Sequence, residues 1–199
     1  MKTILAAALL LTLCAFAGDG RADDADVCRE CHLSRASVVT DNKAPALAGQ
    51  HPAYIVRQLE RFASADKDDP YRRINTAMAH TLRGLERSKW QGIAETLSAE
   101  KCPFHGNETL PTLTPNVCAS CHGARGLSGN PDIPNLAGQD ARYLFYQYLK
   151  LREPYDIDIP GVEASGRAKR LHPVMGSVAA QLNDGVIAVI SYYSKLPCR

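Results

Sequence analysis

Two short segments of the chain carry the same arrangement of cysteines and histidine. Each has two cysteines separated by two residues and a histidine directly after the second cysteine: Cys28-Arg-Glu-Cys31-His32 and Cys118-Ala-Ser-Cys121-His122. A zinc knuckle would need two further ligands per site at regular spacing, and a thioredoxin-like redox pair would accompany a βαβ pattern. The sequence shows neither. The motif predicts two covalent haem c groups, attached through the four cysteines as thioethers, with His32 and His122 as iron ligands.

The second axial ligand of each iron must come from elsewhere in the chain. Iron with a histidine on one side takes methionine or histidine on the other side in electron carriers. Apart from the initiator, the chain has two methionines, Met78 and Met175, and each follows its motif at a distance that allows it to reach the opposite face of a haem. We predict that they are the axial ligands. His80 and His51 are alternatives in the first half, and His172 is one in the second.

The two motifs belong to an internal duplication. The matched features, in order, are residues 45–50 (Pro-Ala-Leu-Ala-Gly-Gln) with 134–139 (Pro-Asn-Leu-Ala-Gly-Gln), Tyr54 with Tyr143, Gln58 with Gln147, residues 73–78 with 170–175, and Cys102 with Cys198. This order predicts two tandem domains, over 23–105 and 116–199. Residues 106–115 contain two prolines and several turn-forming residues, which disfavour helix, so we predict that they are a linker.

Each half has apolar residues at helical spacing. We expect helices over 54–62 and 143–151, and a closing helix after each methionine, over 86–99 and 184–195. Asp184 would cap the last helix and Pro197 would end it. No pattern typical of a β-hairpin occurs. The sequence therefore predicts an all-α fold of short helices, whose small cores a large, flat, apolar cofactor would complete.

The first residues have the pattern of a secretion signal. Lys2 is followed by an apolar stretch over 4–16, which is too short to span a bilayer comfortably, and by a small-x-small site ending at Ala17. We expect residues 1–22 to be a signal peptide, cleaved after Ala17 or Ala22, and the mature protein to be soluble in the periplasm. With 45% hydrophobic residues, 22% charged residues and a net charge of +2, the composition is globular and gives no support for a nucleic-acid partner.

These residues resemble the class I c-type cytochromes, and in particular the two-haem cytochrome c4 family. The resemblance covers the whole mature chain and rests on the two haem motifs, the repeated Pro-x-Leu-Ala-Gly-Gln string with its following tyrosine, and the two methionines. It implies two tandem class I cytochrome c-like domains, each wrapped around one covalent haem. It also implies that the carbonyls of Pro45 and Pro134 accept hydrogen bonds from His32 and His122, which would fix the rings and tune the iron.

Two features depart from the pattern of this family. The first motif continues with Leu33 where the second has Gly123, so we expect the surroundings of the two haems to differ. The family pattern also gives no role to Cys102 and Cys198. Because free thiols are unusual in exported proteins, we predict a disulfide between them, which would tie the linker to the C-terminus. Ligation of iron by a cysteine is the alternative.

A haem with two protein ligands has no open position for a substrate, so we expect transfer of single electrons rather than an enzyme. The expected partners are redox proteins: a donor dehydrogenase or quinol-oxidising complex and an acceptor oxidase or reductase. We expect the protein itself to be a monomer, either free or associated with the membrane surface. One alternative is a subunit of a dehydrogenase such as flavocytochrome c sulfide dehydrogenase. Another is an enzyme with one catalytic haem. Arg73 and Arg170 would neutralise haem propionates or lie on the surface as ordinary charged residues.

Overall fold

The computed structural model describes residues 24–32, 44–102, 116–152, 170, 172–182 and 185–198, and these residues form helices and turns without any strand. This confirms the predicted all-α class. The predicted signal peptide and the predicted linker over 106–115 lie outside the described residues. Within the described ranges no single helix is long and apolar enough to cross a membrane, and the two last helices reach such a length only together, across a bend of 119°.

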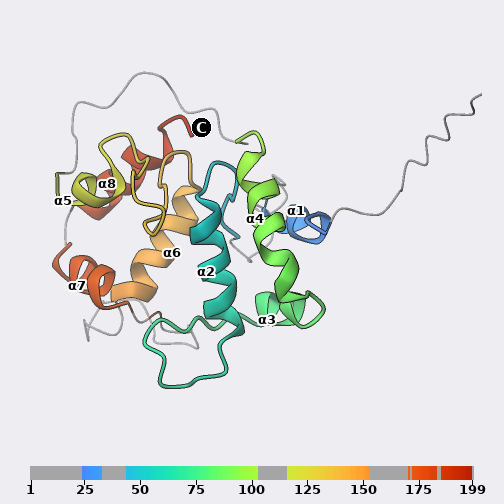
Figure 1. Ribbon diagram of the computed structural model, residues 1–199. Helices are drawn as coiled ribbons and strands as arrows, with labels where there is room; N and C mark the ends of the chain where they lie inside the picture. The colour runs from blue at the N-terminus through green and yellow to red at the C-terminus, as the bar shows by residue number, and fades with distance from the viewer. Residues whose placement is uncertain are drawn as a thin grey trace, which may run out of the picture.

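The same order of helices occurs twice along the chain. Each half has a helix with the haem motif, a longer helix, a helix with the methionine and a closing helix. In the first half these are α1 (Asp26–His32), α2 (Pro52–Ala63), α3 (Thr76–Arg83) and α4 (Trp90–Ala99), the last preceded by the 3-10 turn η2 (Arg87–Lys89); in the second they are α5 (Asn116–His122), α6 (Ala141–Arg152), α7 (Pro173–Gln181) and α8 (Val186–Ser194). Figure 1 shows the two sets on opposite sides of the molecule, with α2 and α6 in the middle.

The four predicted helical stretches correspond to α2, α6, the η2–α4 pair and α8. The final helix begins at Val186 with Gly185 at its N-cap position, whereas Asp184, the predicted cap, lies outside the described residues. The helix ends at Ser194, shortly before Pro197, which has no amide hydrogen to continue the helical bonds.

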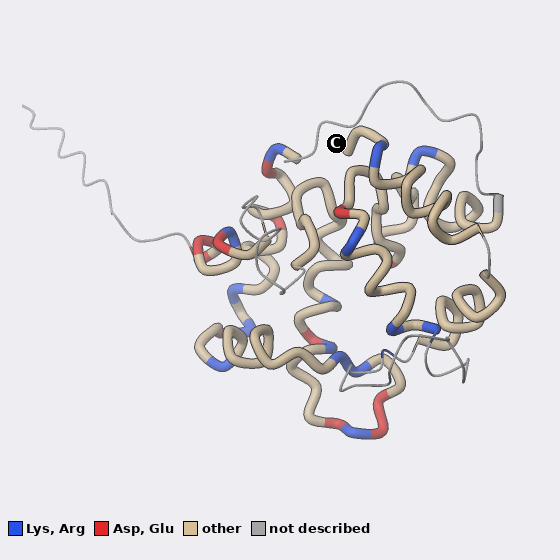
Figure 2. Tube along the Cα trace, turned by 180° about the vertical axis from the view of Figure 1, so that it is seen from behind, with Lys and Arg blue, Asp and Glu red and all other residues tan. Residues whose placement is uncertain are grey.

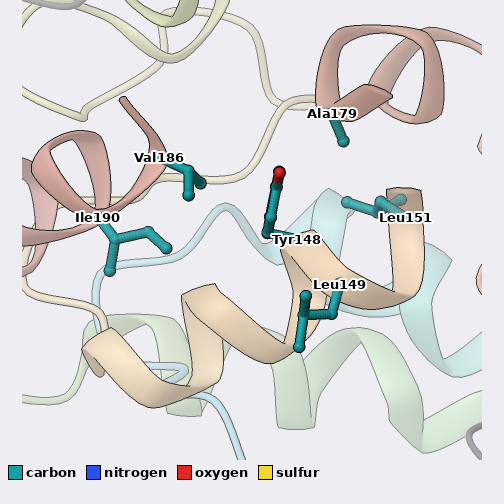
Figure 3. Packing of buried hydrophobic residues seen from close by; sticks show 6 residues of the cluster. All are labelled: Tyr148, Leu149, Leu151, Ala179, Val186 and Ile190. Atoms are coloured by element: carbon teal, nitrogen blue, oxygen red, sulfur yellow. The ribbon is translucent and has the colours of Figure 1, made fainter. Parts of the chain in front are cut away.

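Each half has an apolar core of its own. In the first half α2 packs on α3 and α4, and in the second α6 packs on α7 and α8. The buried side chains of the first core are Ile55, Leu59, Leu82, Trp90 and Ala94, and those of the second are Tyr148, Leu149, Leu151, Ala179, Val186 and Ile190 (Figure 3). Burial of one large apolar side chain contributes about 1.5–3 kcal/mol. Among the described residues, every apolar cluster draws its members from one half only.

The duplicated Pro-x-Leu-Ala-Gly-Gln loops are fastened to the closing helices. The amide of Gly49 donates to Ser98 O at 2.9 Å, and the amide of Gly138 donates to Tyr193 O at 3.0 Å. Gly138 has φ of +66°, and a Cβ atom there would overlap with Sγ of Cys198. Only glycine fits this position, because both its backbone conformation and the adjacent sulfur exclude a side chain.

A disulfide joins the ends of the two halves. Cys102, just after α4, is bonded to Cys198, just after α8, with their Cα atoms 6.0 Å apart and a sequence separation of 96. Cross-linking such distant positions removes conformational freedom from the unfolded chain. The bond therefore holds the two closing helices at a fixed separation and packs against the loop at Gly138.

Replacing both cysteines by serine (C102S/C198S) is expected to lower the free energy of unfolding by about 2–4 kcal/mol, because the unfolded chain regains the freedom that the closed loop removes. Guanidinium unfolding of the oxidised protein measures this change. Dithiothreitol should shift the wild-type midpoint towards that of the variant and leave the variant itself unaffected. A variant as stable as the oxidised wild type would contradict the stabilising role of this disulfide.

Candidate haem sites

The histidines of the two motifs lie at equivalent places and make equivalent hydrogen bonds. His32 ends α1 and its Nδ1 lies 2.8 Å from Pro45 O, and His122 ends α5 with Nδ1 2.8 Å from Pro134 O. Because a carbonyl only accepts, Nδ1 carries the proton and Nε2 carries the lone pair. Burial lowers the pKa of both histidines, which keeps the rings neutral. Each ring is thus oriented and protonated as a metal-ligating imidazole requires.

The cysteines of each motif are three residues apart on a helix and therefore share one face. Cys31 and Cys121 are exposed, whereas Cys28 and Cys118 are partly buried and pack against the apolar clusters of the closing helices. Burial raises the pKa of the Cys118 thiol. No group of three or more His, Cys, Asp or Glu side chains in the described part of the chain could hold a bare metal ion.

The backbone beyond the second motif requires a glycine. Gly123 has φ of +79°, and a Cβ atom there would overlap with Leu127 O. The chain turns sharply at this residue so that the loop can return to the histidine. The corresponding Leu33 of the first motif lies outside the described residues.

The two methionines occupy the same place in two capped helices. The amide of Met78 in α3 donates to Oδ1 of Asn75 at 3.0 Å, and the amide of Met175 in α7 donates to Nδ1 of His172 at 3.3 Å. Both caps precede their methionine by three residues, which is the usual reach of an N-cap side chain. Each methionine is partly buried against the core of its own half, so its position is set by packing as well as by the cap.

The three other candidate histidines make contacts of their own. His51 lies with Nε2 3.0 Å from Ser128 O in the other half, and exposed His80 contacts Arg83 at 3.0 Å. His172 is the N-cap of α7, and its ring meets that of Tyr71 edge-on at 5.2 Å. Burial lowers the pKa of His172 to about 4, with Arg170 and Arg61 adding to the effect. His172 is therefore neutral near pH 7, as a ring that accepts a backbone hydrogen bond must be.

Two arginines, Arg73 and Arg170, lie where the halves meet. Arg73 donates to Oε1 of Gln58 at 2.9 Å, and Arg170 donates to Oε1 of Gln147 at 2.7 Å. Burial lowers the pKa of Arg73, and the charge of Arg170 lowers it further. In the ranges that the structure covers, no carboxylate lies within ion-pair distance of either arginine. Figure 2 shows basic positions gathered near the ends of the central helices.

This arrangement fits a haem, because each haem brings two negatively charged propionates. Two adjacent guanidinium groups without a counterion repel each other and favour an anion between them. The buried Nε2 of Gln58 and Nε1 of Trp90 have no hydrogen-bond partner among the described residues, so donors are also available for carboxylate oxygens. The residues present therefore match the ligand chemistry, the attachment chemistry and the charge of the predicted cofactor.

The sequence did not reveal the structural roles of several residues that shape these sites. Asn75 and His172 are caps, and their signal was a side chain able to accept a hydrogen bond three residues before each methionine. Gln50, Gln139 and Asn135 are buried in the repeated loops, and their signal was only the repetition itself. Arg73 was left open between two roles, and the structure places it in a partly buried position beside Gln58.

Proteins of known identity resemble this chain in sequence over most of its length. No model of a protein family matches the chain. The thiosulfate dehydrogenase electron acceptor of Stutzerimonas stutzeri is 26% identical over 94% of this chain and 90% of its own length. Cytochrome c4 of Thiocapsa roseopersicina is 30% identical over 89% of each chain.

Solved structures share the fold. Reduced cytochrome c4 from Pseudomonas stutzeri superposes with a TM-score of 0.63 at 23% identity, covering 86% of this chain and 94% of that one. Thiosulfate dehydrogenase from Marichromatium purpuratum gives a TM-score of 0.60 at 22% identity, covering 86% of this chain but 36% of that longer one. The likeness to the Thiocapsa protein extends over nearly the whole of both sequences, and on that basis the chain belongs to the cytochrome c4 family, electron-transfer proteins that bind two covalent haem c groups.

Proposed function

We propose that each half holds one haem between a histidine and a methionine: His32 with Met78, and His122 with Met175. The observation that carries this proposal is that both halves repeat the same construction. In each, an imidazole that is at least partly buried donates through Nδ1 to a proline carbonyl, and a methionine lies at the third position of a capped helix. The four motif cysteines would supply the thioether bonds. The bound haem supplies an iron centre that takes up and releases one electron.

The protein's residues determine how that centre behaves. The proline carbonyls hold the imidazole rings in one orientation and raise their basicity. Methionine sulfur favours the ferrous state, and packing of both methionines against the apolar cores supports retention of the ligand in both oxidation states. Arg73 and Arg170 offset the propionate charge where the halves meet. With both axial positions filled, the protein has no site for a substrate on the iron, which favours electron transfer.

We further propose that the protein is exported to the periplasm, where it accepts electrons from a dehydrogenase and passes them to a terminal oxidase or reductase. The signal-like N-terminus and the Cys102–Cys198 disulfide support export, because such bonds persist in oxidising compartments. One relative is named as the electron acceptor of thiosulfate dehydrogenase, and a structural neighbour is itself a thiosulfate dehydrogenase. These two names favour an enzyme that oxidises an inorganic sulfur compound as the donor.

Replacing the second pair of cysteines (C118S/C121S) is expected to halve the haem content, because the first half keeps its own attachment residues. Mass spectrometry of the mature protein should show two haems on the wild-type chain and one on the variant. The matched variant C28S/C31S should also keep one haem. Two haems retained on either double variant would show that the thioether assignment is wrong.

Replacing Met78 or Met175 by alanine is expected to abolish the sulfur-to-iron absorption of one haem, lower its potential and open it to carbon monoxide, because thioether sulfur raises the potential and closes the site. Optical redox titration of each purified variant measures this. H80A and H51A are the controls and should keep both sulfur signals. An unchanged spectrum of M78A, with carbon monoxide binding gained in H80A or H51A, would reverse the assignment in the first half.

Stopped-flow mixing with a purified thiosulfate dehydrogenase and thiosulfate tests the donor. Rapid reduction of both haems, slowing as ionic strength rises, is expected of a carrier that meets its donor through charged surfaces. Gel filtration of the mixture separates the two roles. A stable complex would favour a fixed subunit over a mobile carrier, and absence of reduction would exclude this donor.

A further inference from the structure

The two repeated loops meet at the boundary between the halves and exchange hydrogen bonds reciprocally. The side chain of Gln139 accepts from the amide of Ala46 at 2.9 Å through Oε1 and donates to Ala46 O at 3.1 Å through Nε2. The side chain of Gln50 accepts from the amide of Asn135 at 3.0 Å and donates to Asn135 O at 2.5 Å. Because the two glutamines hold the same place in the repeat, as do their targets, the exchange has approximate two-fold symmetry.

These contacts are shielded from water. Gln50 is 7% exposed, Gln139 5%, Ala46 8% and Asn135 7%. A hydrogen bond in such surroundings is stronger electrostatically than one in water, and a buried amide that lost its partner would remain unsatisfied. The glutamines are therefore the groups that complete the hydrogen bonding of these two backbone positions.

The peptide groups that are bonded to the glutamines are also bonded to the histidines. The carbonyl of Pro45 accepts from His32, and the amide hydrogen of that same peptide unit, which belongs to Ala46, is the one donated to Gln139. In the other half one peptide unit likewise links His122, through Pro134 O, to Gln50 of the first half. Each continuous path thus runs from a histidine, through one peptide group, to a glutamine of the opposite half.

A peptide group transmits polarisation because its C–N bond has partial double-bond character. An acceptor on the N–H side increases the negative charge on the carbonyl oxygen, so the carbonyl becomes a better acceptor for a donor on its other side. A stronger bond from Nδ1–H gives the imidazole more anionic character, and a more basic imidazole stabilises ferric iron relative to ferrous iron. Loss of the glutamine acceptor would reverse each of these effects.

We propose that Gln139 and Gln50 are positioning residues that act across the boundary, each lowering the potential of the haem in the opposite half. This inference rests on the proposed assignment of His32 and His122 as iron ligands. Each glutamine thus affects the haem of the other half and not the haem of its own half. The potential of each haem depends on correct docking of the other half.

The two directions of this effect are unequal. Asn135 has a side chain that also donates to Gly49 O at 2.7 Å and accepts from the amide of Ser128 at 2.7 Å. The bond from the amide of Ser128 lies within the second half, so it holds the second loop in place when Gln50 is altered. Ala46 has no polar side chain, so the first loop depends more strongly on Gln139. Loss of Gln139 therefore changes a haem potential more than loss of Gln50 does, and the potential that changes is that of the first haem.

The test uses the two-haem protein with Q139L and Q50L, which keep a side chain of similar bulk without the amide. Redox titration, with each potential assigned through M78A and M175A, should show Q139L raising the first haem's potential and leaving the second unchanged. Q50L should raise the second, by a smaller amount. NMR should show several-fold faster exchange of the His32 Nδ1 proton in Q139L. Q139E, which keeps an acceptor for the Ala46 amide, should restore slow exchange.

Arg57 provides a matched control, because its exposed ion pair with Asp132 crosses the same boundary without touching either peptide group. R57A should change neither potential. Equal shifts of both haems in Q139L, a shift confined to the second haem, or no shift would overturn the proposal. If any of these occurs while the spectra still show two haems with histidine–methionine ligation, only the proposed effect of each glutamine on the opposite haem is refuted. Wild-type spectra without histidine–methionine ligation would instead refute the proposed function.

Discussion

The hydrogen bond between the histidine of each motif and a proline carbonyl is the interaction on which the rest of this structure depends. It sets the tautomer and the orientation of His32 and His122, and it brings the end of each motif helix against the following loop. The loop in turn is fastened to the closing helix through Gly49 or Gly138. Two hydrogen bonds in each half, one from the histidine and one from the glycine, thus connect the attachment helix, the loop and the closing helix.

The protein separates its apolar and polar contacts by location. Apolar clusters stabilise each half from within, whereas the described contacts between the halves are mainly hydrogen bonds and ion pairs, such as those of His51 and Arg57. Apolar packing tolerates small shifts, but a bidentate amide contact requires a defined geometry. The boundary is therefore suited to fixing the relative position of two redox centres, and the Cys102–Cys198 bond adds a covalent limit to their separation.

Much of the fold could be read from the sequence because its signals are local. Helical spacing located α2 and α6, and the duplication showed which residues correspond between halves. The scarcity of methionine pointed to Met78 and Met175. The roles of His51 and the loop glutamines could not be read in this way, because each depends on a partner in the other half. Likewise, the pairing of Arg73 with Gln58 depends on how α2 packs, which the order of residues does not specify.

The reciprocal glutamine contacts have the geometry of an isologous contact, in which the same patch on two copies of a protein meets itself. Two separate domains with this loop would meet through the same bonds only in an association that depended on their concentration. Joining two copies in one polypeptide makes that encounter intramolecular. Dilution then no longer separates the partners, and each copy is free to carry differences, such as Ala46 opposite Asn135, that a true homodimer could not keep apart.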